Sequence, residues 1–325
     1  MAPPAAAPAK PPPLPAAERA LSEAIRENLW FGDDDPERSA SQASHSLAAA
    51  VARAAGLKPF PVVAQRVMQL LDDPDTPTVK IRRAIEQDPA LAARLLRVAN
   101  SALYSPAVSC RSIDDAIVRL GNRTVTEIVT SLATLGMFSD VQGLGLTFRD
   151  HCVAVAALAR VLGTEWRYRG VEGAFLAGLM HDIGKLLAMQ AGDIHYESFD
   201  PAALAKPDEI HIHERAVSGF DHAVLGAHVL EHWKLPGEVA QIVAWHHQPG
   251  RAFAAGGSIG TGVALLRLAD TIEYQLRRSR DLDEAFVEQL AQDGAAEYAQ
   301  FSREILIAMW PKFVAAREEM GRATA

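Results

Sequence analysis

The chain has 325 residues, of which 49% are hydrophobic and 22% are charged, and its formal net charge is −8. This balance is that of an ordinary globular protein, and the acidic excess argues against a protein built mainly to neutralise nucleic-acid phosphates. No apolar stretch reaches the ~18 residues needed to span a bilayer, and the N-terminus lacks the apolar core of a secretion signal. We therefore expect a cytoplasmic protein without a membrane partner, in which Cys110 and Cys152 are reduced thiols.

Residues 1–45 are predicted to be a disordered, Ala/Pro-rich leader with one helix. The first 17 residues are almost entirely alanine and proline. Because proline fixes φ and removes a backbone donor, this composition predicts an extended, solvated tail. The single helix is expected over residues 17–29, and the polar stretch from Gly32 to Ser46 is typical of a linker.

Residues 46–140 are predicted to form an N-terminal lobe of short helices. Pro61 opens a helix whose apolar residues recur on one face. Asp88 precedes a proline, which is the pattern of an N-cap followed by a first-turn proline. Ser112 stands three residues before an acidic residue, as in a capping box, and Gly121 ends that helix.

A second helical lobe is predicted over residues 141–280, followed by a C-terminal helical extension over residues 281–325. The glycine-rich stretch at 143–146 marks the break between the lobes. Alanine and leucine dominate the chain, and runs of strand-favouring residues are scarce. The predicted fold class is therefore all-α, with two packed helical lobes, the second of which is a helical bundle.

Helices of the second lobe carry histidine or aspartate where a bundle would have leucine. Helical spacing places these side chains on apolar faces: His151, His181, Asp182, His222, His246, His247 and Asp270. A lone histidine on an apolar face is more often a hydrogen-bonded core residue than a ligand. A buried carboxylate, however, is costly without a partner, so each aspartate needs a cation. Lys185 lies four residues after His181 and could serve one of them.

A shared metal centre would explain all seven side chains by one cause. Imidazole and carboxylate together suit Zn, Mn, Fe or Ni, so we expect a divalent transition metal, as one or two ions, with Asp182 bridging a pair. The remaining six histidines lie off the apolar stripes or in loops, and we expect them to be solvated: His45, His195, His211, His213, His228 and His232.

The order of these residues resembles a known superfamily. An initial His, an HD doublet with a following Lys, a later His, an HH pair and a final Asp are similar to the HD superfamily of metal-dependent phosphohydrolases. Four segments resemble HDOD, the HD-related output domain of bacterial signalling proteins: LKPFPVVAQRVMQLL, QDPALAARLLRVANSALYS, SIDDAIVRLG and ERAVSGFDHAVLGAHVLEHWKLPGEVAQIVAWHH. The resemblance covers about residues 54–255. It implies that the second lobe is an HD-domain-like bundle and that the protein has a regulatory role.

The sequence departs from the HD-GYP branch of the same superfamily. No GYP tripeptide occurs in the chain, which implies that cyclic-di-GMP is not hydrolysed. Thr147 stands four residues before His151, where some HD-GYP proteins have an additional acidic ligand. The long segment between Asp182 and His222 would have to loop out.

Three functions are compatible with these features. Our preferred hypothesis is a non-catalytic signal-output module that binds a signalling protein or a small nucleotide, with its input supplied by another molecule because no receiver or sensory domain is recognisable. The second is a metal-dependent phosphohydrolase acting on a nucleotide or cyclic dinucleotide, in which the metal activates water and Lys185 stabilises phosphate charge. The third is a nucleic-acid binder, which we disfavour because acidic residues nearly balance the arginines of the first lobe.

Overall fold

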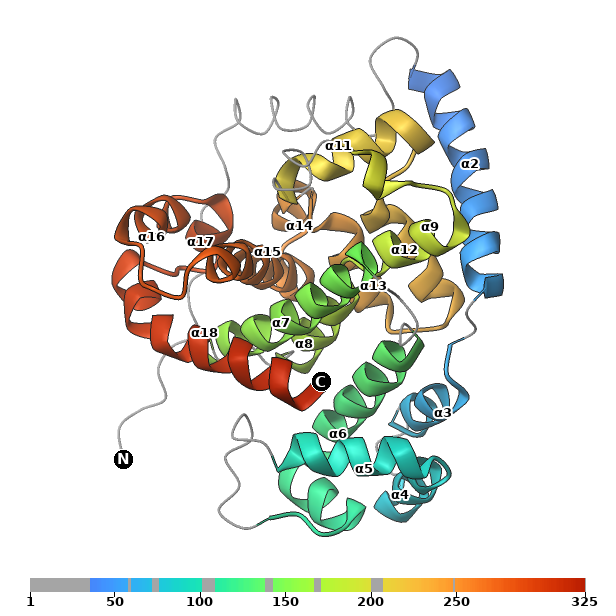
Figure 1. Ribbon diagram of the computed structural model, residues 1–325, viewed down its shortest axis with the longest axis vertical. Coiled ribbons are helices and arrows are strands. Elements are labelled where there is room, and N and C mark those ends of the chain that lie inside the picture. Colours follow the sequence, from blue (N-terminus) through green and yellow to red (C-terminus); the bar gives the residue numbers. More distant parts are fainter. Residues whose placement is uncertain are drawn as a thin grey trace.

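The computed structural model describes residues 36–57, 60–71, 76–100, 109–137, 143–166, 171–199, 207–247 and 249–324. Every regular element in these ranges is a helix (Figure 1), so the all-α prediction is confirmed. Within the same ranges, no helix is both long enough and apolar enough to cross a membrane. The predicted disordered tail and the helix expected at residues 17–29 lie outside the described residues.

The first lobe is formed by four helices at the bottom of Figure 1: α3 (Val62–Leu71), α4 (Thr78–Glu86), α5 (Pro89–Ala99) and α6 (Ile113–Met137). They enclose a core of their own, which includes Ile81, Leu95 and Ile128. The end of α6 extends beyond this core, and its Leu135 packs against the apolar core of the second lobe. The two lobes are therefore packed together, as predicted.

Helix boundaries in the first lobe follow from local hydrogen bonds. The backbone N–H of Leu91 donates to Asp88 Oδ1 at 3.0 Å, which confirms the predicted N-cap of α5. The backbone N–H of Ser112 donates to Asp115 Oδ2 at 2.9 Å, and that of Asp115 donates to Ser112 Oγ at 3.1 Å, which completes the predicted capping box. Gly121 has a φ of 80°, which glycine adopts without steric cost, and it breaks the helical path inside α6.

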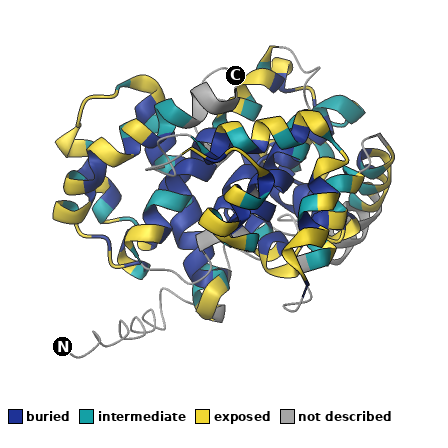
Figure 2. Cartoon of the chain, turned by 90° about the horizontal axis from the view of Figure 1, so that it is seen from below, coloured by how far each residue is buried: buried dark blue, intermediate teal, exposed yellow. Residues whose placement is uncertain are grey.

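The second lobe contains the remaining helices: α2 (Pro36–Leu57), α7 (Leu144–Glu165), α8 (Val171–Met180), α9 (Ile183–Ala191), the short 3₁₀ turn η2 (Tyr196–Ser198), α11 (Pro207–Ser218), α12 (His222–His232), α13 (Gly237–Trp245), α14 (Pro249–Ala255), α15 (Gly257–Arg278), α16 (Glu284–Ala291), α17 (Gly294–Tyr298) and α18 (Arg303–Thr324). Helix α7 packs against α8, α15 and α18. Figure 2 shows that the buried residues lie where the helices face one another and that their outer faces are exposed. Cys110 and Cys152 are both buried and form no disulfide with each other.

Helix α2 corrects the prediction of a linker between Gly32 and Ser46, because the chain is helical from Pro36. Proline is tolerated in the first helical turn, and the residues that follow include several good helix formers. Ala50 and Ala54 of α2 are fully buried in the core of the second lobe, where α2 packs against α9 and α12 (Figure 1). By its packing, α2 lies with the second lobe although it precedes the first lobe in the chain.

The C-terminal helices return to the second lobe. Helix α18 packs along α7, and its Leu306 and Phe313 are fully buried. Trp310, also on α18, donates its indole N–H to the carbonyl oxygen of Arg280 at 3.1 Å. These contacts place α18 against the helix that carries His151.

Candidate metal centre

The structure brings the seven predicted ligand side chains together inside the second lobe. They come from the middle of α7, the turn between α8 and α9, the start of α12, the residues directly after α13 and the middle of α15. Two of the side chains, His151 and His247, are partly exposed. The other five are buried: His181, Asp182, His222, His246 and Asp270. The helices therefore converge on one polar centre in an otherwise apolar core.

Two glycines allow α9 and α12 to approach closely enough to form this centre. A Cβ atom on Gly184 would lie 2.0 Å from the carbonyl oxygen of His222, so only glycine fits there. A Cβ atom on Gly226 would lie 3.3 Å from the backbone nitrogen of Gly184, so the two helix backbones approach closely here. Asp221 caps α12 by accepting the backbone N–H of Val224 at 2.9 Å, which fixes His222 as the first residue of the helix.

A first group of ligand atoms is formed by His151, His181 and Asp270. His151 Nε2 lies 3.1 Å from Asp270 Oδ1 and 3.2 Å from His181 Nε2. The Nδ1–H of His181 donates to the carbonyl oxygen of Gly178 at 2.7 Å, which leaves its Nε2 facing the centre. Ligand atoms about 2.1 Å from a tetrahedral ion lie about 3.4 Å from one another, so these separations are close to those a metal requires.

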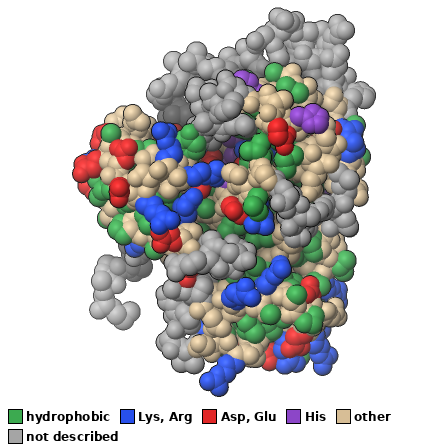
Figure 3. Space-filling model, in the orientation of Figure 1, with side chains coloured by type: hydrophobic (Ala, Val, Ile, Leu, Met, Phe, Trp, Pro, Cys, Tyr) green, Lys and Arg blue, Asp and Glu red, His purple; other side chains and the backbone are tan. Residues whose placement is uncertain are grey.

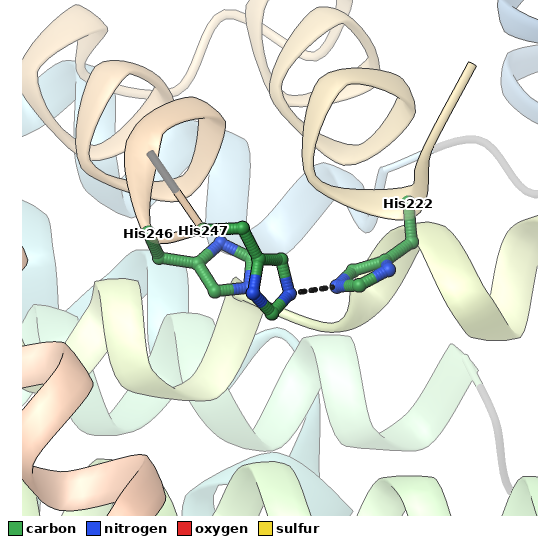
Figure 4. Close-up of side chains that lie close together, drawn as sticks. All are labelled: His222, His246 and His247. Atoms are coloured by element: carbon green, nitrogen blue, oxygen red, sulfur yellow. Dashed lines mark hydrogen bonds between the residues drawn. The ribbon is translucent and has the colours of Figure 1, made fainter. Parts of the chain in front are cut away.

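A second group is formed by His222, His246 and His247, whose three rings meet in Figure 4. His247 Nε2 lies 3.0 Å from His222 Nε2. The Nδ1–H of His246 donates to the carbonyl oxygen of Val243 at 2.6 Å. Its Nε2 is buried and has no hydrogen-bond partner among the described residues. A bound metal would satisfy this orphaned nitrogen, so the second group also fits a metal ion.

Asp182 lies between the two groups. Its Oδ1 is 3.1 Å from His222 Nε2 in the second group, and its Oδ2 is 3.6 Å from His151 Nε2 in the first. Lys185 Nζ donates to Oδ2 at 2.7 Å and so supplies the cation expected for this aspartate. Burial raises the pKa of Asp182, but the surrounding positive groups outweigh it and hold the pKa well below its usual range. The carboxylate is thus ionised, and it would be available to a metal ion held by either group.

Two buried glutamates that the sequence analysis missed hold the outer sides of the ligand histidines. The Nδ1–H of His151 donates to Glu273 Oε2 at 2.7 Å, and the Nδ1–H of His222 donates to Glu214 Oε2 at 2.6 Å. The hydroxyl of Tyr196 donates to the other oxygen of Glu214 at 2.8 Å. Carboxylates in this position fix the tautomer of a metal-binding histidine and turn its Nε2 toward the metal.

The neighbouring charges decide which rings of the centre are protonated. Burial opposes protonation of His151 and His222, but the adjacent carboxylates outweigh it and raise the pKa of each ring to about 9. Burial, together with nearby positive rings, lowers the pKa of His246 and of His247. Protons on these two rings therefore contribute, together with Lys185, to compensating the buried carboxylates, and a metal ion would replace those protons.

His211 was expected to be solvated, and that prediction was wrong. Its ring is buried and stacks on His247, with ring centroids 4.5 Å apart and an angle of 11° between the planes. Burial lowers the pKa of His211 to about 4, so the ring is neutral. Four of the other histidines are exposed as predicted: His195, His213, His228 and His232. The side chain of the fifth, His45, lies outside the described residues.

The burial of His211 has its origin in the segment between Asp182 and His222. The segment was expected to loop out, and that prediction was wrong, because its described residues form α9, η2 and α11. Helix α11 contacts the second group through two side chains. His211 stacks on His247, and Glu214 accepts the Nδ1–H of His222. The segment is thus a structural part of the centre.

Comparisons with known proteins agree with this architecture. The family model described as HDOD domain matches residues 57–249. A Treponema pallidum (strain Nichols) protein described as uncharacterized is 25% identical over 215 residues, which cover 62% of this chain and only 40% of that protein.

Two solved structures share the fold. One, from Shewanella amazonensis SB2B and named as a candidate phosphohydrolase, has a TM-score of 0.66 at 24% identity and covers 86% of this chain and 98% of its own. Another, from Marinobacter aquaeolei VT8 and named as a candidate signal transduction protein, has a TM-score of 0.57 at 22% identity and covers 86% of this chain and 66% of its own. At these identities the likeness concerns the fold alone.

Proposed function

The chain belongs to the HDOD family, and from that premise we propose that it is a regulatory output module of bacterial signal transduction. It acts by binding a partner or a ligand, and its HD-type centre binds metal without catalysing a reaction. The position of Lys185 carries this proposal. Its ammonium group is buried, donates to Asp182 Oδ2 at 2.7 Å and lies 5.7 Å from the ring centroid of Phe148. Because the positive charge of Lys185 is neutralised by the Asp182 carboxylate, this lysine would stabilise a substrate phosphate only weakly.

The donor set supports a divalent transition metal, Fe, Mn, Zn or Ni, as one or two ions. When bound, such an ion supplies positive charge and Lewis acidity at the buried carboxylates. Its ligands would come from α7, the α8–α9 turn, α12, α13 and α15. Because a metal that binds only the folded state adds its binding energy to stability, the centre would hold these helices together.

The partner that we propose is a cytoplasmic signalling protein, with a small nucleotide as a further ligand. Nucleic acid is disfavoured by the net charge of −8. On the face shown in Figure 3, basic and acidic side chains are intermixed, and no broad basic surface appears among the described residues.

The second candidate is a metal-dependent phosphohydrolase acting on a nucleotide or cyclic dinucleotide. The specific observation in its favour is that two groups of ligand atoms meet at Asp182, since paired metal sites are common in phosphoryl chemistry. The name of the Shewanella amazonensis protein points the same way. The absence of a GYP tripeptide argues against cyclic-di-GMP as its substrate.

Metal content and phosphate release separate the two candidates. The purified protein would be assayed for bound metal and then for hydrolysis of a nucleotide panel and of cyclic-di-GMP, with Mn or Fe added. We expect bound metal and no meaningful hydrolysis. Turnover on the order of 1 per second that disappears in an Asp182→Ala variant would contradict the regulatory proposal and support the phosphohydrolase.

A further inference from the structure

The C-terminal helix α18 reaches the candidate metal centre through one buried carboxylate. Glu273 on α15 is 1% exposed, and its Oε2 accepts the Nδ1–H of His151 at 2.7 Å. Arg317 on α18 donates to the other oxygen, Oε1, from Nη2 at 3.3 Å and from Nε at 3.4 Å. These bonds form a continuous path from α18 through α15 to the ligand histidine on α7.

Arg277 completes the surroundings of this carboxylate. It lies one turn after Glu273 on the same helix and donates to Oε2 from Nη2 at 3.1 Å and to Oε1 from Nε at 3.4 Å. Arg277 is 39% exposed, whereas Arg317 is 25% exposed. The more deeply buried of the two guanidinium groups is thus that of Arg317, which belongs to α18 and not to the helix of Glu273.

A buried carboxylate is stable only when its charge and lone pairs are satisfied. The rigid fork of an arginine also restricts how the carboxylate can turn. Because Glu273 holds Nδ1 of His151, its orientation sets the direction in which Nε2 of the same ring points. That direction is toward Asp270 and His181, the other ligands of the first group.

We propose that Arg317 is a positioning residue of the first metal site and that docking of α18 is coupled to metal binding at His151. The inference rests on the metal centre of the proposed function. Coupling between two events is reciprocal, so metal binding would stabilise the docked α18 and loosening α18 would weaken the metal site. A partner that draws α18 away would thereby lower metal affinity. Glu273, Arg277 and Arg317 all lie beyond residue 249, where the match to the family model ends.

The same helix offers a matched control. Lys312 on α18 pairs with Glu165 at the end of α7 at 3.0 Å, and both side chains are exposed. Lys312→Gln therefore removes one positive charge and one contact between α18 and α7 without touching Glu273. The docking of α18 itself does not depend on either cation alone, because Leu306, Met309 and Phe313 are buried in the core.

The experiment uses the full chain as wild type, Arg317→Gln, Arg317→Lys and Lys312→Gln, with Co²⁺ as the probe. Visible spectra and calorimetry would follow Co²⁺ binding at each step, and amide hydrogen exchange would follow residues 311–319. We expect Arg317→Gln to weaken the first site about tenfold, at the lower end of the range for residues behind a metal ligand. The second site and the Lys312→Gln variant should be unchanged, and Arg317→Lys should recover part of the affinity. In the wild type, Co²⁺ should slow exchange in α18, and in Arg317→Gln this response should be lost.

The Co²⁺ experiment distinguishes a failure of the coupling between α18 and the first site from a failure of the metal centre itself. If the wild type binds Co²⁺ at the first site and Arg317→Gln binds it equally well, with the same exchange in α18, the coupling is wrong while the metal centre stands. An equal loss in Lys312→Gln and Arg317→Gln would likewise overturn the inference, because it would show only a general weakening of α18. If the wild type binds no Co²⁺ at either site, the proposed metal centre is wrong, and the inference falls with it.

Discussion

Replacing Asp182 with asparagine removes a charge from the middle of the centre while keeping the volume of the side chain. Asp182 is 1% exposed and lies 2.7 Å from Lys185 Nζ and 3.1 Å from His222 Nε2. In Asp182→Asn these two groups would stay buried beside a neutral amide. Breaking a buried ion pair from one side typically costs ~3–5 kcal/mol, because the remaining charge is left uncompensated.

This cost can be converted into a change in unfolding temperature. For a chain of this size, 1 kcal/mol corresponds to about 2 °C, so we expect the midpoint of Asp182→Asn to fall by about 6–10 °C. Asp114→Asn is a matched control, because Asp114 pairs with Arg82 at 2.8 Å but is 48% exposed. Exposed pairs contribute less than about 1 kcal/mol, so the control should lose no more than about 2 °C.

The assay is thermal unfolding of wild type and both variants, each with and without a strong chelator. A metal present at about 100 times its dissociation constant adds about 2.7 kcal/mol, or about 5 °C. The chelator should therefore lower the wild-type midpoint by several degrees and have little effect on Asp182→Asn. Equal, small responses in wild type and variant would refute the reasoning, because they would mean that the histidines are ordinary hydrogen-bonded core residues.

Three further predictions concern the same centre. Gly184→Ala should destabilise the fold by about 1–3 kcal/mol in denaturant titrations, because its Cβ would lie 2.0 Å from the His222 carbonyl oxygen. Gly173→Ala is the control and should be neutral or stabilising, because an added Cβ there meets nothing within 4 Å. An equal loss of stability in both variants would contradict the close approach of α9 and α12. Glu214→Gln should weaken metal binding at the second group by about 10–100-fold in calorimetry and leave the first group unchanged; a uniform loss at both groups would argue against a local role. Metal affinity should rise from pH 7 to pH 9, because the pKa of His151 and of His222 is about 9 and the metal must displace their protons. Calorimetry in buffers of different ionisation enthalpy would detect the released protons. A metal affinity that does not change with pH would contradict this prediction.

The features predictable from sequence are those with a local physical cause. The cap at Asp88 and the capping box at Ser112 depend on residues within one helical turn, so their spacing is visible in the chain. The polar positions inside the second lobe were also accessible, because a carboxylate such as Asp270 on an apolar helix face is costly without a partner. Periodicity and desolvation together were sufficient to single out the seven side chains that lie together in the second lobe.

The features that could not be predicted depend on how distant helices meet. Glu214 and Glu273 look like ordinary solvated acids in sequence, and only the packing of α11 and α15 shows that they hold histidines eight and 122 residues away. One signal was available for Glu273, since it follows Asp270 by three residues and so shares its side of α15. His211 gave no such signal, because its burial arises from the stacking of its ring on His247, a residue that is distant in the sequence.

Anomalous X-ray diffraction from crystals of the purified protein, recorded at the absorption edge of the metal it contains, tests the central claim most directly. We predict one or two peaks beside Asp182, the first about 2.0–2.2 Å from Nε2 of His151 and of His181, and the second at the same distance from the rings of His222 and His246. A centre in which these nitrogens contact only one another and ordered water, with no anomalous peak after metal has been added, would contradict the account.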